Sequence, residues 1–198
     1  MKMKQRIAAL AVFCLALSCA SGAKSESGAE GAAARSAAQP AEDEQEDLLR
    51  GDFRVEVKGE GPSKTITITG YIGPGGDLAI PERIDRIPVT VIGEEAFKGC
   101  DGLVRVTIPD TVAAIGDWAF TECENLTAVA FPPSVAAIGR SAFSWCASLV
   151  SVTIPPTVAS IGERGFSYCS RLRNVSLSRK TAVGVDAFPQ EAAITYTD

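Results

Sequence analysis

The 198-residue sequence predicts a repeat solenoid whose coils stack short parallel β-strands into a concave face. Residues 92–114, 115–137 and 138–160 align without gaps, and residues 161–182 form a fourth block that is one residue shorter. The period is 23 residues, and the shared pattern is I-G-x-x-A-F-x-x-C-x-x-L-x-x-V-x-I-P-x-x-V-x-x. About ten positions recur in register, so the pattern describes one structural unit used repeatedly.

Each position of the repeat has a structural role that its residue type explains. In the first block Val106 and Ile108 alternate with period two after Leu103, which is typical of a short strand with one buried face. Pro109 ends the strand because it cannot donate to a ladder. Gly93 indicates a bend, either because a side chain would obstruct there or because a positive φ is needed. The Phe of each block is expected to fill the centre of its coil.

The segment before the repeats is predicted to form a hairpin cap over residues 51–75. Residues 53–57 and 65–69 alternate as strands around the Gly59-Glu60-Gly61 turn, and we expect them to shield the first edge of the stack. The array itself is predicted over residues 76–198, with about five coils. Its entry coil has a strand at Leu78-Ala79-Ile80-Pro81, a longer loop, and a bend at Val91-Ile92-Gly93.

The N-terminal segment is predicted to be a lipoprotein signal peptide over residues 1–18. Lys2, Lys4 and Arg6 precede an apolar run of 11 residues, which is too short to span a bilayer but suits a signal sequence. The stretch that ends in Ser18-Cys19 resembles a bacterial lipobox, so Cys19 is the expected lipidation site. An ordinary secretory signal, cut near residue 20 or 23, is the alternative.

Residues 19–50 are predicted to be a disordered tether. They are almost entirely Ala, Gly, Ser, Glu, Gln and Asp, and such a stretch cannot bury enough apolar surface to offset the entropy lost on ordering. The whole chain has a formal net charge of -5, which becomes -8 once the three basic residues of the signal are removed. An acidic chain is a poor candidate for binding nucleic acid.

The cysteines do not have the spacing of a metal site. Cys100, Cys123, Cys146 and Cys169 recur every 23 residues, whereas zinc sites require closely spaced pairs. We predict a column of small buried thiols, each donating to a turn carbonyl; stacked disulfides are the alternative.

Catalysis is not indicated by any motif. The chain has no His, which excludes a His general base and a Ser-His-Asp triad. The Gly59-Glu60-Gly61 stretch lacks the ending of a phosphate-binding loop. The sequence therefore predicts no enzyme activity, no cofactor and no metal.

The repeat pattern resembles the BspA-like, or treponemal, leucine-rich repeat of bacterial surface proteins, over about residues 51–196. That resemblance implies a right-handed leucine-rich-repeat coil and a non-enzymatic protein-binding function: adhesion to an extracellular-matrix or cell-surface protein, or self-association. With the lipid anchor, it implies an extracytoplasmic location, at the outer membrane or cell surface rather than the inner membrane. A periplasmic scaffold or envelope-assembly factor with the same anchor is the alternative.

Two surfaces are candidates for binding a partner. The concave face is built from the outward strand positions, which carry Arg105, Thr107, Ala128, Ala130, Ser151, Thr153, Asn174 and Ser176. The convex side carries Trp145 and Tyr168 in one column, with Trp118 nearby in the preceding coil. Exposed aromatic side chains would be the best anchors in the chain. The alternative is that these rings only cover the edge of the coil.

Overall fold

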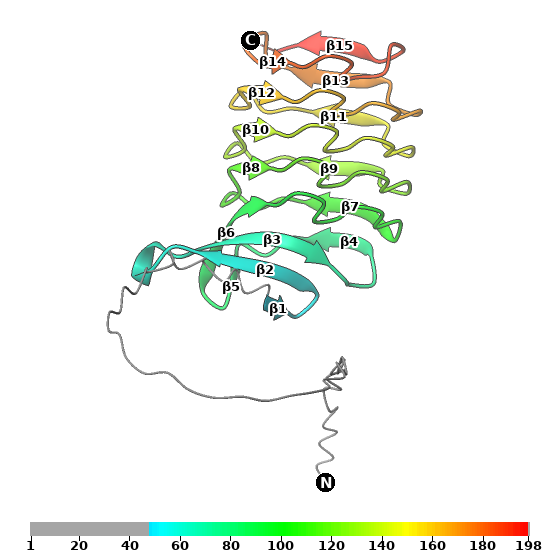
Figure 1. The fold of residues 1–198 in the computed structure, drawn as a ribbon. Helices are drawn as coiled ribbons and strands as arrows, with labels where there is room; N and C mark the ends of the chain where they lie inside the picture. The colour runs from blue at the N-terminus through cyan, green and yellow to red at the C-terminus, as the bar shows by residue number, and fades with distance from the viewer. Residues whose placement is uncertain (1–47, 198) are drawn as a thin grey trace, which may run out of the picture. The chain divides into compact units, whose positions relative to one another are not determined.

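The computed structural model describes residues 48–197 and forms a solenoid in which coil stacks on coil (Figure 1). The predicted signal peptide, Cys19 and nearly all of the predicted tether lie outside these residues. Besides one short 3-10 helix, η1 (Gly61–Ser63), the regular elements are the strands β1 (Leu48–Arg50), β2 (Phe53–Lys58), β3 (Thr65–Tyr71), β4 (Gly76–Ala79), β5 (Arg83–Ile84), β6 (Ile87–Ile92), β7 (Leu103–Thr107), β8 (Ala114–Ile115), β9 (Ala128–Ala130), β10 (Ala137–Ile138), β11 (Ser151–Thr153), β12 (Ser160–Ile161), β13 (Asn174–Leu177), β14 (Ala182–Val183) and β15 (Ala193–Tyr196).

The L-x-x-V-x-I segments form the predicted parallel strands, stacked one coil apart. They make two three-stranded sheets, in the orders β4-β7-β9 and β11-β13-β15, rather than one continuous sheet. The register places each residue beside its equivalent in the next coil, as in the pairs Arg105–Ala128 and Ser151–Asn174. Beside this interruption Phe131 stands where the first and third blocks have Ile, and its ring packs edge-on against Phe143.

On another wall of the solenoid lies a further sheet, which the sequence analysis did not predict; we call it the second sheet, since the two three-stranded sheets lie on one wall. Its strands β6, β8, β10, β12 and β14 pair in that order, and β8, β10, β12 and β14 are only two residues long. In β8, β10 and β12 the buried Ile is paired with the Ile one coil away, as in Ile115–Ile138, whereas β14 places the exposed Val183 beside Ile161. Two residues are too few to show period-two alternation, so the pattern that revealed the longer strands is absent here.

The turns of successive coils form a third hydrogen-bonded wall. The amide of Phe97 donates to the carbonyl of Ala119, Phe120 to Ala142, and Phe143 to Gly165. The same coil-to-coil bonds occur two residues before and two residues after each Phe. The turn backbone is therefore satisfied by the neighbouring coil, and its conformation is set by the stack.

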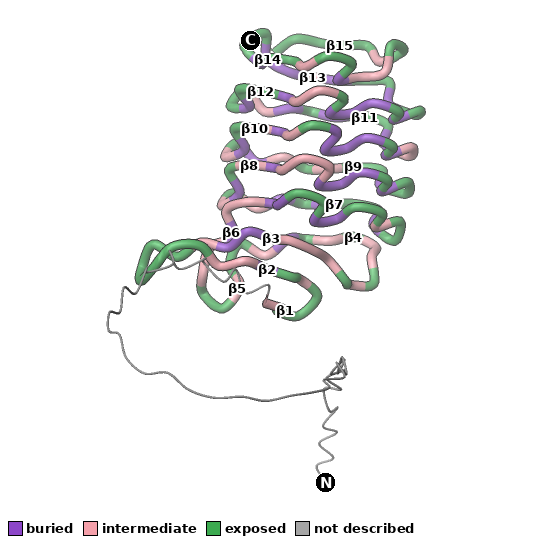
Figure 2. Tube along the Cα trace, viewed as in Figure 1, coloured by how far each residue is buried: buried purple, intermediate pink, exposed green. Residues whose placement is uncertain are grey.

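The core is a continuous column of aromatic rings inside these walls. Phe97, Phe120, Phe143 and Phe166 are fully buried, and neighbouring rings lie 4.7–5.0 Å apart with interplanar angles of 5–6°. Figure 2 shows buried positions repeating in every coil. This confirms the expectation that Phe fills the centre of each coil, and it explains why no coil is a closed core by itself.

The first edge of the stack is built from the N-terminal strands. β2 and β3 pair antiparallel, as expected for the hairpin, and β3 then pairs in parallel with β6. The hairpin is thus an extension of the second sheet. β1 pairs with β2, although its residues fall at the end of the predicted tether. This end of the tether prediction is wrong, because the partly buried Leu48 packs against the core and adds an edge strand.

The bend glycine recurs in every block for a steric reason. A Cβ on Gly139 would lie 2.6 Å from the backbone of Asp117 and Gly116 in the preceding coil, and a Cβ on Gly116 would lie 2.8 Å from Gly93. None of these glycines has a positive φ. Of the two reasons that the sequence left open, close approach between coils is therefore the correct one.

The repeated cysteines are free thiols rather than disulfides. The Sγ of Cys123 donates to the carbonyl of Phe97 at 3.1 Å, and Cys146 and Cys169 make the equivalent bond one and two coils further on. These three are fully buried, whereas Cys100 in the first coil is partly exposed. Burial raises the pKa of the Cys123 thiol to about 12. The prediction of a column of buried thiols is confirmed for three of the four.

Candidate functional site: a groove on the turn face

The strand face, which is the predicted concave surface, carries small and weakly charged side chains. Arg105, Thr107, Ser151, Thr153 and Asn174 are exposed, and Ser176 is half-buried. The guanidinium of Arg105 pairs with the carboxylate of Asp77 at 3.3 Å, and both groups are more than 60% exposed. Such a pair contributes little to stability or affinity. The strand face therefore offers repeated polar positions without an aromatic anchor among the predicted residues.

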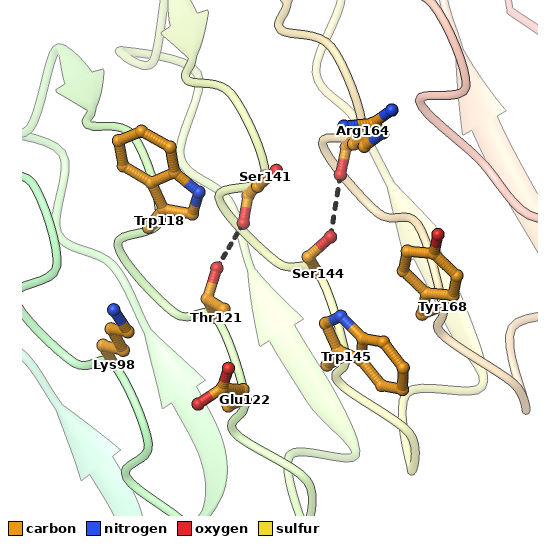
Figure 3. A pocket seen from close by; sticks show the side chains of 9 residues that line it. All are labelled: Lys98, Trp118, Thr121, Glu122, Ser141, Ser144, Trp145, Arg164 and Tyr168. Atoms are coloured by element: carbon orange, nitrogen blue, oxygen red, sulfur yellow. Dashed lines mark hydrogen bonds between the residues drawn. The ribbon is translucent and has the colours of Figure 1, made fainter.

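The turn face, which is the predicted convex side, is hollowed into a groove that we call the turn groove (Figure 3). One wall is a column of residues two positions after each bend glycine: Trp118, Ser141 and Arg164. The other wall is the column directly before each cysteine, Glu122, Trp145 and Tyr168. Lys98 lines the groove as well. The volume of the groove is about 320 Å³.

The floor of the groove is made of buried hydroxyl side chains. The hydroxyl of Thr121 donates to the carbonyl of Ser141, and the hydroxyl of Ser144 donates to the carbonyl of Arg164 at 3.1 Å. Figure 3 shows both bonds crossing from one coil to the next. Because these hydroxyl protons are used within the stack, Thr121 and Ser144 offer a ligand only acceptor capacity. Small side chains at these positions and at Ser141 also leave the space open.

Two of the three predicted aromatic residues form a stacked pair on the outer wall. The rings of Trp145 and Tyr168 lie 4.4 Å apart with an interplanar angle of 16°, and the two residues are 51% and 57% exposed. Trp118 is half-buried on the opposite wall, and the guanidinium of Arg140 lies 5.9 Å from the centre of its ring. The three residues that sequence analysis singled out therefore line one groove.

The aromatic residues stand on backbone that side chains normally avoid. Trp118, Trp145 and Tyr168 have φ values of 52°, 63° and 60°. For a residue other than glycine, this left-handed conformation costs roughly 1–2 kcal/mol. In the first coil the position equivalent to Trp145 is Gly99, with φ 67°, which avoids that cost. For Trp118 and Trp145, coil-to-coil hydrogen bonds from their own amides to Arg140 and Ser167 hold the backbone in this conformation.

Charges around the groove are mostly paired. The ammonium of Lys98 bonds to the carboxylate of Glu95, and this hydrogen bond raises the pKa of Lys98 above its usual value. The guanidinium of Arg164 lies 3.5 Å from the carboxylate of Glu163. Glu122, in contrast, is exposed and has no ion pair among residues 48–197. Its carboxylate interacts with the ammonium of Lys98 over a longer range and contributes to the raised pKa of that lysine.

Sequence reasoning missed the groove itself and the residues that complete it. Lys98, Glu122, Ser141 and Arg164 vary from coil to coil, so the consensus excludes them. They could have been found by aligning the blocks and comparing the residues that occupy the same variable position in successive coils. The depth of the groove could not, because it depends on the left-handed turns.

Among the described residues, neither a candidate metal-ligand cluster nor a candidate membrane-spanning helix is found. Residues 48–197 contain no group of three or more Cys, Asp or Glu placed to hold a metal ion. Within the same range, no helix is long and apolar enough to cross a membrane. The chemistry of the groove is that of recognition: exposed rings, a carboxylate and hydroxyl acceptors.

A family model described as "BspA type Leucine rich repeat region" matches residues 87–197 in six copies. No curated protein matches the sequence well enough to count as a relative. Among solved structures, the chain is similar to a leucine-rich repeat protein from Bacteroides ovatus, with 27% identity and a TM-score of 0.65 over 76% of this chain and 41% of that one.

Two further structures are similar to the chain. A leucine rich cell surface protein from Faecalibacterium prausnitzii has 25% identity and a TM-score of 0.63, over 77% of this chain and 40% of its own. The T. pallidum Leucine Rich Repeat protein has 28% identity and a TM-score of 0.52, over 75% of this chain and 85% of its own. The chain thus spans about two fifths of the length of the first two proteins.

Proposed function

Because the chain belongs to the BspA-type leucine-rich-repeat family, we propose that it is a non-enzymatic binding module, lipid-anchored outside the cytoplasm, that attaches the cell to a protein partner. One similar protein is described as a cell surface protein, which supports the location. The scaffold supports the binding role, since stacked coils present a large rigid surface. The turn groove is the surface on which we expect the partner to bind.

The stacked and exposed pair of Trp145 and Tyr168 is the observation that carries this proposal. Each residue is more than half exposed, so the two rings cover little of the apolar surface of their coils. Packing within the stack is therefore a weak explanation for two large aromatic side chains here. Each residue also occupies a left-handed position where glycine would cost less. Large rigid aromatic side chains of this kind are the residues that dominate protein interfaces.

The binding test compares cells that display the full chain with cells that display Trp145→Gly. Glycine keeps the left-handed backbone and removes the ring, so the stack should remain folded. Immobilised extracellular-matrix proteins and a layer of the wild-type chain are first screened for a surface that retains wild-type cells. We expect Trp145→Gly cells to lose adhesion to that surface. Val104→Ala is the matched control, because Val104 is an exposed apolar residue of β7 on the strand face. Unchanged adhesion of Trp145→Gly cells would contradict the role of the groove.

The anchor is proposed at Cys19 and is tested by metabolic labelling with an alkyne fatty acid. Cys19→Ser should lose the label and be released from the membrane fraction, whereas Cys14→Ser, inside the predicted signal peptide, should keep it. A protein that is cut normally and carries no lipid would instead support the ordinary secretory signal.

Surface exposure separates adhesion from the periplasmic scaffold. An adhesin should be removed from intact cells by external protease, together with its adhesion. If the protein survives until the outer membrane is permeabilised, adhesion is excluded and the scaffold function is the better proposal.

A further inference from the structure

One face of the Trp145 ring is open to a ligand. The opposite face is covered by Tyr168, which belongs to the next coil of the same column. The open face is directed toward the preceding coil, where the equivalent position is Glu122 (Figure 3). An aromatic face with a carboxylate at its side is a favourable environment for a cation.

The position of the charges, rather than their sum, favours a cation beside Trp145. Lys98 and Arg164 are the basic residues that line the groove, and each is already paired with a neighbouring glutamate. Glu122 has no ion pair among the described residues. Glu122 is the one acidic residue of the groove lining, and its carboxylate also interacts electrostatically with the ammonium of Lys98. The negative net charge of the chain acts in the same direction.

The geometry of a guanidinium fits this site better than that of an ammonium. A planar guanidinium can lie parallel to an indole ring and still direct N–H groups toward a carboxylate at its edge. The fold itself contains two contacts between a guanidinium and an aromatic ring: Arg140 lies 5.9 Å from the centre of the Trp118 ring, and Arg179 lies 4.9 Å from that of Tyr196. The volume of about 320 Å³ has room for one long side chain with its adjoining backbone.

We propose that the turn groove binds an arginine side chain of the protein partner, with the guanidinium stacked on the open face of Trp145 and the carboxylate of Glu122 as its counter-ion. This proposal rests on the proposed function, because it names the group of the partner that the binding module recognises. It is reversible and non-covalent. The aliphatic part of the arginine would lie over the floor at Ser144, and its backbone would leave the groove between the two walls.

The test uses the tryptophan fluorescence of the full-length protein. Trp118 and Trp145 are the two tryptophans of the sequence and both line the groove, so the signal reports this site alone. N-acetyl-arginine amide is titrated as the probe. N-acetyl-citrulline amide, which has the same shape and no charge, is the ligand control. We expect a saturable change with the arginine probe that weakens as salt is added, and at least roughly fivefold weaker binding of the citrulline probe.

The variant Glu122→Gln tests the counter-ion. It should weaken the arginine probe by roughly fivefold, about the strength of one exposed ion pair, and leave the citrulline probe unchanged. Glu124→Gln is the matched control, because Glu124 is also exposed and does not line the groove. Circular dichroism before each titration confirms that both variants are folded.

Four results would overturn the inference. Equal binding of the arginine and citrulline probes would show that the groove does not recognise the positive charge. Equal effects of the two glutamate variants would show that Glu122 is not the counter-ion. A saturable response to maltotriose, with none to the arginine probe, would assign the groove to a glycan. If none of the probes binds while the cell-adhesion test succeeds, the arginine proposal fails and the binding function stands.

Discussion

Phe143→Ala should be among the most destabilising single substitutions in the array. Phe143 is fully buried at the middle of the aromatic column. Its ring stacks between Phe120 and Phe166, each 5.0 Å away, and Phe131 packs edge-on at 5.5 Å. Removing this ring opens a cavity between two coils and breaks the column, which couples them together with the parallel strands and the turn hydrogen bonds.

The magnitude follows from the buried area and the ring contacts. A buried phenylalanine removes roughly 200 Å² from water, which corresponds to about 5 kcal/mol as an upper value. Phenylalanine-to-alanine changes in protein cores cost about 3–5 kcal/mol. Phe188 is the matched position at the end of the column, with partial exposure and a stacking contact to Phe166 at 5.4 Å. We therefore expect Phe188→Ala to cost about 1–2 kcal/mol, scaled down from the same range.

Equilibrium urea unfolding of both variants, followed by far-ultraviolet circular dichroism, measures the difference. Phe143→Ala should shift the midpoint by at least twice as much as Phe188→Ala. It should also broaden the transition, because the coils on either side are then only weakly coupled. Equal shifts, or a larger shift for Phe188→Ala, would show that the aromatic column does not distribute stability along the stack as argued here.

The thiols and the turns give three further expectations. A thiol reagent at pH 8 should label Cys100 in the folded protein and reach Cys123 only on unfolding. Folding raises the pKa of Cys123 to about 12, so between about pH 9 and this value only the unfolded thiol loses its proton. The free energy of unfolding should therefore fall as pH rises above about 9, which urea midpoints at pH 8 and 10 would measure. In urea unfolding, Gly139→Ala should cost about 1–3 kcal/mol, because its Cβ would overlap the backbone of the preceding coil. Gly99→Ala should cost about 1 kcal/mol, because Gly99 has open space around it and only its φ of 67° disfavours a side chain. Trp145→Gly should be roughly 1 kcal/mol more stable than Trp145→Ala by thermal melting, and the reverse order would argue against strain at this turn.

Features that depend on one residue type at a fixed place were predictable from the sequence. The strand around Val106 follows from period-two alternation, the hairpin from alternation on both sides of a glycine turn, and the Cys123 bond from a small thiol in every coil. In each case the evidence lies within one 23-residue block or in its repetition.

Features made by contacts between coils were not predictable. The sheet of two-residue strands, the third wall of turn hydrogen bonds and the pairing of β1 all join residues distant in sequence. The turn groove belongs to this group. Trp118 and Trp145 were recognised as candidates, but the hydrogen bonds that hold their backbone left-handed, and the open space above Ser144, arise only when coils are stacked.

The sequence by itself determined the period, the inward residues and therefore the solenoid, because burial of one apolar set every 23 residues has few other solutions. The tertiary structure decided how the variable residues that share a column are oriented, paired and exposed. It brought Trp145 against Tyr168, left Glu122 without an ion pair among the described residues, and set both beside the same hollow. The physical reason is that hydrogen bonds and ring contacts along the stack connect residues one coil apart, and these contacts give the surface its shape and charge.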